Sequence, residues 1–148
     1  MTQKDKELLL KDLCARLPYG VKCAYFNTKD EIKVGELLTV WCKEKRVFID
    51  KLSIDYDGGD CIGVIPYLFP MSSMTDEQKE ELLEITDAIK IDDIGLYYEE
   101  GDTLETYLSQ IPYTFMCKIV TWCYRNHLDI NNLIPLNLAI DATGLNIY

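Results

Sequence analysis

The stretch VKCAYFNTKDEIKVGELLTVWCKEKRVFIDKLSIDY, residues 21–56, decides the fold class. Residues 21–69 contain four β-prone runs, at 21–26, 32–42, 46–56 and 61–69. Asp57-Gly58-Gly59-Asp60 predicts a hairpin turn before the last run, because glycine adopts positive φ at no steric cost. Gly35 predicts a β-bulge inside the second run. Strands so close in sequence pair most simply as an antiparallel meander.

Helical periodicity precedes and follows these runs. Residues 4–17 carry one apolar stripe, which consists of Leu9, Leu10, Leu13, Cys14 and Leu17. Pro18 and Gly20 end this helix. Thr75 and Gln78 form the capping-box pattern of a second helix, whose apolar stripe is Leu82, Ile85 and Ile89. Both segments therefore predict amphipathic helices that pack on one face.

A third helix is expected from about Tyr113. Its two apolar rows are Phe115, Ile119 and Trp122, and Met116, Val120 and Cys123. The apolar tail 128–148 is expected to pack on the body. The sequence thus predicts one α+β domain over 1–148, with an N-terminal helix, an antiparallel meander of about four strands, two further helices and a packed C-terminal tail.

Composition indicates a soluble globular protein. Hydrophobic residues make up 48% and charged residues 27% of the 148. Residues 1–6 show no apolar export signal, and no apolar run approaches the roughly 20 residues of a membrane span. We therefore expect a cytoplasmic protein without a membrane partner. The six cysteines contain no C-x-x-C pair, so reduced structural thiols are expected.

The net charge of −10 is concentrated in one segment. Residues 75–105 hold twelve acids and two bases, whereas acids and bases balance in 1–74 and again in 106–148. Such a segment repels phosphates, which disfavours direct nucleic-acid binding, and it attracts basic surfaces. Along the second helix, Glu77, Glu80, Glu84 and Asp87 recur at i+3 and i+4 spacing. The first hypothesis is a non-enzymatic interaction protein that binds a basic partner through residues 75–105.

Cys123, His127 and Asp129 carry the second hypothesis. Cys123 and the only histidine are four residues apart on a helix, a spacing that suits two metal ligands or a nucleophile pair. A small hydrolase or metal-dependent enzyme centred on His127 would follow. The alternative is a structural histidine that contacts the last helical carbonyls, where positive charge is favoured. The spacing alone does not separate these readings.

Familiar catalytic and cofactor motifs are missing from the sequence. There is no phosphate-binding glycine loop, no G-x-S-x-G and no H-E-x-x-H. Asp55-x-Asp57 resembles the start of a calcium loop, but Pro66 stands where its bidentate Glu belongs. We therefore expect no cofactor and no metal.

Three stretches resemble a group of small uncharacterised proteins encoded by gut Bacteroidales genomes, prophages and mobile elements. They are LLKDLCARLPYGVK (9–22), PYLFPMSSMTDEQKEEL (66–82) and NHLDINNLIPLNLAIDA (126–142). The group typically reads N-H-[FY]-D-Y-R-G-L-I in the third stretch, and this chain matches it at Asn126, His127, Asp129, Leu133 and Ile134. The resemblance implies a phage or mobile-element origin and no mechanism. A structural subunit of a phage assembly is therefore a third hypothesis.

Overall fold

The computed structural model describes residues 1–26, 31–41, 46–50, 52–55, 63–86, 90–92, 95–97 and 113–148. The helices are α1 (Gln3–Arg16), α2 (Asp76–Thr86) and α4 (Tyr113–Arg125), with short 3-10 turns η1 (Leu17–Tyr19) and η2 (Met71–Ser73). The strands are β1 (Lys22–Phe26), β2 (Ile32–Trp41), β3 (Arg46–Ile49), β4 (Leu52–Asp55), β5 (Ile65–Leu68), β6 (Lys90–Asp92), β7 (Gly95–Tyr97) and β8 (Ile140–Asp141). This is an α+β fold, as predicted.

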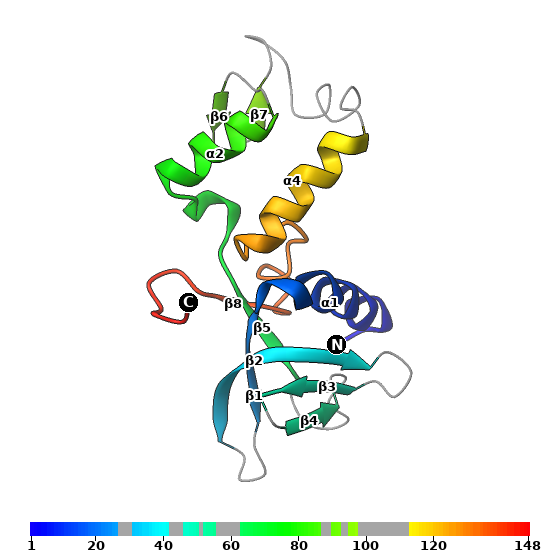
Figure 1. Ribbon diagram of the computed structural model, residues 1–148. Coiled ribbons are helices and arrows are strands. Elements are labelled where there is room, and N and C mark those ends of the chain that lie inside the picture. The colour runs from blue at the N-terminus through cyan, green and yellow to red at the C-terminus, as the bar shows by residue number, and fades with distance from the viewer. Residues whose placement is uncertain are drawn as a thin grey trace.

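Six strands form one sheet in the order β4-β3-β2-β1-β5-β8 (Figure 1). Strands β1 to β4, which come from the first three predicted runs, pair as an antiparallel meander. Strand β5 leaves this order, because it pairs with β1 on the far side of the sheet and not with β4. The tail adds β8 parallel to β5. The expectation that the fourth run continues a simple meander is therefore wrong, because β5 lies between β1 and β8 and not beside β4.

Two local strand predictions also need correction. The run at 46–56 is not one strand: Asp50 has a φ of 53°, and the chain reverses there so that β3 pairs with β4. The register shift in β2 lies between Leu37 and Thr39 and not at Gly35. A Cβ on Gly35 would collide with the side chains of Asp50 and Ile49, so this glycine permits close packing. The predicted turn at 57–60 lies outside the described residues.

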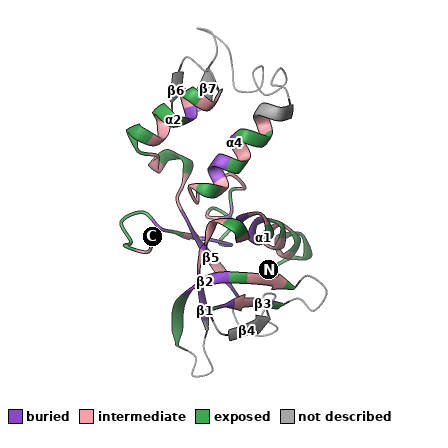
Figure 2. Cartoon of the chain, viewed as in Figure 1, coloured by how far each residue is buried: buried purple, intermediate pink, exposed green. Residues whose placement is uncertain are grey.

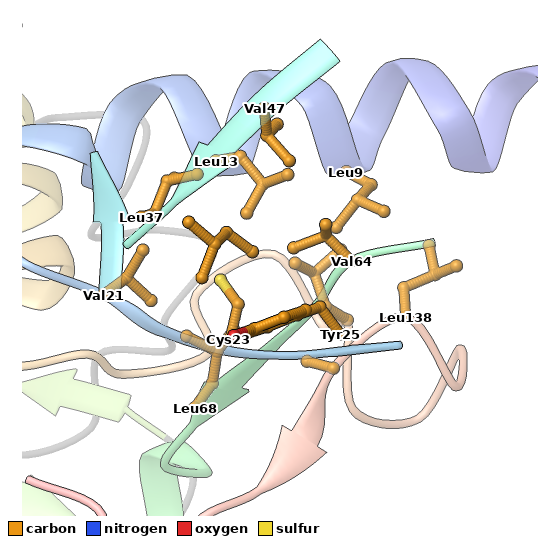
Figure 3. Close-up of a cluster of buried hydrophobic side chains, with 13 residues drawn as sticks. Leu9, Leu13, Val21, Cys23, Tyr25, Leu37, Val47, Val64, Leu68 and Leu138 are labelled. Carbon is orange, nitrogen blue, oxygen red and sulfur yellow. The ribbon is translucent and has the colours of Figure 1, made fainter. Parts of the chain in front are cut away.

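Helix α1 covers the sheet and closes the main core. Leu9 and Leu13 point from α1 toward β1, where Cys23 and Tyr25 face them (Figure 3). The predicted stripe is shifted, however, because Cys14 is exposed while Asp12 and Arg16 are fully buried. Burial of a charged pair beside an apolar cluster needs internal partners.

Helices α2 and α4 lie side by side at one end of the molecule (Figure 1). The predicted cap is confirmed: the Gln78 backbone N–H donates to the Thr75 hydroxyl, and the Thr75 backbone N–H donates to the Gln78 side-chain carbonyl. A second core joins the helices through Leu82, Ile119, Trp122, Cys123 and Leu128. Ile89 of the predicted stripe lies outside the described residues.

The C-terminal tail packs on the body, as predicted. Buried apolar residues recur along it among exposed ones (Figure 2); they are Leu128, Leu133, Leu138, Ala139 and Ala142. None of the helices in the described part of the chain has the length and apolar character needed to cross a bilayer.

Candidate functional site

The acidic stripe of α2, which we define as Glu77, Glu80 and Glu84, is exposed along its length. Three- and four-residue spacing places these carboxylates on one helical face. Asp87, the fourth predicted member, lies outside the described residues. Lys79, the only base in α2, forms an exposed ion pair with Asp76 at 3.4 Å and not with the stripe. Within the described part of the chain, no ion pair joins the stripe to a basic side chain, so it presents like charges to solvent.

Glu77 is held in its charged form. Hydrogen bonds from its own backbone N–H and from the Thr75 side chain lower the pKa of this carboxyl. Its place in the first turn adds favourable interaction with the helix dipole. The negative charge of the stripe thus persists into mildly acidic solution at its N-terminal end.

A groove of about 460 Å³ runs between α2 and α4, next to the acidic stripe. Its α2 wall consists of Glu81, Glu84 and Ile85. Its α4 wall consists of Lys118, Thr121, Trp122 and Arg125. The volume falls within the range of small-ligand and side-chain binding pockets. Glu84 belongs both to the stripe and to the groove, so the two features form one continuous surface.

The groove separates charge across its width. Both acids stand on the α2 wall and both bases on the α4 wall, and each wall also contributes one large apolar residue, Ile85 from α2 and Trp122 from α4. Within the described residues, no ion pair joins Glu81 or Glu84 to Arg125. The buried indole N–H of Trp122 also has no hydrogen-bond acceptor there. The groove therefore offers both signs of charge to an occupant.

Cys123, in the second candidate site, is fully buried in the core between α2 and α4. Burial raises the pKa of its thiol to about 11. A reactive cysteine has a lowered pKa and some exposure, because the thiolate is the nucleophile and the metal ligand. The surroundings of Cys123 thus favour packing over chemistry.

His127 ends α4 in a left-handed conformation, with a φ of 56°. Its backbone N–H donates to the Tyr124 carbonyl, and the Leu128 N–H donates to the Cys123 carbonyl. This pair of bonds is a Schellman C-cap, in which glycine is the usual residue. The ring stacks on Tyr148, and burial, with Arg16 and Lys22 nearby, lowers its pKa to about 4. His127 is therefore a structural residue, as one of the alternatives held. The expected positive charge on its ring is wrong, however, because the ring is neutral near pH 7.

Asp129 is buried, and backbone groups occupy both of its carboxylate oxygens. One accepts from the Leu133 N–H and the other from the Ile134 N–H, each at 2.8 Å. Charge-assisted bonds of this kind fix a turn. No group of three or more His, Cys, Asp or Glu side chains that suits a metal ion occurs among the described residues. Each member of this trio therefore has a structural task.

A buried polar network beside His127 was not predicted. Arg16 donates to Asp12 through Nε at 2.6 Å and to the Leu128 carbonyl at 2.8 Å. Its guanidinium lies over the ring of Tyr124, and Asn131 donates to both Asp12 and Tyr124. The sequence does contain a signal for this network. Asp12 and Arg16 are four residues apart and lie on the same helical face as the apolar Leu9 and Leu13. The network joins α1, α4 and the tail.

No protein-family model, curated protein or solved structure matches this chain. The functional argument therefore rests on the residues themselves.

Proposed function

We propose that this protein is a non-enzymatic interaction protein that binds a basic protein partner through the acidic stripe of α2. The observation that carries the proposal is the confinement of the whole net charge of −10 to residues 75–105, where Glu77, Glu80 and Glu84 stand exposed on one helix.

Stability alone gives a weak account of this arrangement. Like charges at i+3 and i+4 cost a few tenths of a kcal/mol per pair, and lysines at alternate positions would have stabilised the helix instead. A basic partner turns each of these repulsions into an attraction. It would also be steered to the helix before contact, so association would slow steeply as salt rises.

The contacts of Cys123, His127 and Asp129 give less support to the alternative of a hydrolase or metal-dependent enzyme. A buried thiol of raised pKa, a stacked neutral imidazole and a carboxylate saturated by backbone N–H groups are all engaged in the fold. Metal analysis of protein purified without chelator tests that alternative directly, because stoichiometric zinc would support it.

The proposal is tested by affinity purification with a matched pair of variants. Glu80→Lys/Glu84→Lys reverses two charges of the stripe, and Glu7→Lys/Glu31→Lys makes the same change in net charge at exposed sites on α1 and beside β2. Captured proteins from a gut Bacteroidales lysate, the host that the sequence resemblance implies, are identified by mass spectrometry. We expect basic proteins that the stripe variant loses and the control retains. Retention of the same proteins by the stripe variant would contradict the proposal.

A further inference from the structure

We propose that the groove between α2 and α4 binds a dipolar segment of the basic partner, one that carries an arginine or lysine close to an aspartate or glutamate. This inference rests on the proposed function, and it adds the element that would select one basic protein among many. An acidic stripe attracts any positive surface, whereas a groove with charged walls of both signs also demands an acid at a fixed place.

The first argument is the segregation of charge. Glu81 and Glu84 line one wall, and Lys118 and Arg125 line the other. No ion pair links Arg125 to either acid within the described residues, so Arg125 and the two acids line one groove without pairing with each other. An occupant with a cation toward α2 and an anion toward α4 completes two ion pairs at once.

The second argument is the apolar part of the groove lining. Ile85 of the α2 wall and Trp122 of the α4 wall contribute it, and the indole N–H of Trp122 has no acceptor among the described residues. The aliphatic stem of an arginine covers such a surface while its head reaches a carboxylate. Arginine suits the α2 wall best, because its planar fork binds carboxylates through two parallel hydrogen bonds.

A peptide selection tests the inference. Randomised short peptides displayed on phage are selected on the immobilised wild-type protein at low salt. We expect a consensus in which a basic and an acidic residue recur at a fixed spacing with an apolar residue near them. A consensus of basic residues alone would overturn the groove inference and leave the proposed function standing. The absence of any basic enrichment would overturn both.

The direction in which one substitution changes the affinity for a selected peptide gives an independent test. Arg125→Glu makes the protein more acidic, so binding through general attraction alone would strengthen. The groove inference predicts the opposite, a weakening of about tenfold, because the variant repels the acid of the peptide. Lys4→Glu makes the same charge change at an exposed position of α1 and serves as the matched control. Unchanged or tighter binding to the Arg125→Glu variant, and to the milder Arg125→Gln, would overturn the inference.

The two tryptophans locate the bound peptide. Trp122 lines the groove, whereas Trp41 lies on β2 and is half exposed. Titration of the selected peptide should shift the indole N–H resonance of Trp122 and leave that of Trp41 in place. A shift confined to Trp41 would place the peptide elsewhere and contradict the inference.

Discussion

The phenol of Tyr148 stacks on the imidazole of His127, with ring centroids 4.0 Å apart and an interplanar angle of 15°. The same phenol enters the sheet. Strands β1 and β5 pair Ala24 with Ile65 and Cys23 with Pro66, so Lys22 and Tyr67 would pair next. The Tyr148 hydroxyl stands between them instead, accepting from the Lys22 N–H at 3.2 Å and donating to the Tyr67 carbonyl at 2.7 Å. One tail residue therefore extends the ladder and covers the helix cap.

Removal of the Tyr148 hydroxyl should weaken the fold. Tyr148→Phe keeps the stacked ring but leaves the Lys22 N–H and the Tyr67 carbonyl without this bridge. We expect a loss of about 1 kcal/mol in the free energy of unfolding, measured by urea denaturation. Tyr148→Ala, which also removes the ring, should lose more. Equal stability of Tyr148→Phe and wild type would show that the bridge contributes nothing.

His127 should titrate at about pH 4, and its contribution to stability should follow that pKa. Between about pH 4 and 6.5 the unfolded state binds more protons than the folded state, so stability falls as the pH is lowered through this window. His127→Asn, which tolerates the left-handed backbone, should remove this part of the pH dependence.

NMR measures the His127 pKa without ambiguity, because the chain contains one histidine. The Hε1 resonance should move only below about pH 5.5. A midpoint near 6.5 would contradict the burial that the structure shows for this ring.

Removing one partner of the buried Asp12–Arg16 pair should cost more unfolding free energy than removing both. Arg16→Met leaves the Asp12 carboxylate buried with Asn131 as its remaining described partner, and we expect a loss of about 3–5 kcal/mol. Asp12→Leu/Arg16→Met removes both charges and should recover much of that loss. Urea denaturation of the two variants gives the comparison, and a double variant no more stable than Arg16→Met would contradict the prediction.

Asp129 should prove to be a structural residue. Asp129→Ala leaves the buried Leu133 N–H and its neighbour, the Ile134 N–H, without their acceptor. The expected cost is about 1–3 kcal/mol of unfolding free energy. Asp129→Asn keeps one acceptor oxygen and should cost less. A fully stable Asp129→Ala protein would instead return Asp129 to the list of candidate functional residues.

The sequence by itself determined the three helices and the approximate places of β1, β2 and β5. Thr75 with Gln78 specified the start of α2, and β-prone runs specified β1, β2 and β5 near their observed places. It also located the acidic segment, since charge is a property of composition. These features depend on contacts within a few residues, such as caps and periodic apolar faces, which a linear pattern records.

Only the tertiary structure decided how these elements meet. The crossing of β5 to the far side of β1, the burial of Arg16 and the neutral state of His127 all depend on residues distant in sequence. The groove is of the same kind, because α2 and α4 contribute one charged wall each. Burial and the spacing of charges across a groove are set by the packing of separate segments, and no local pattern encodes them.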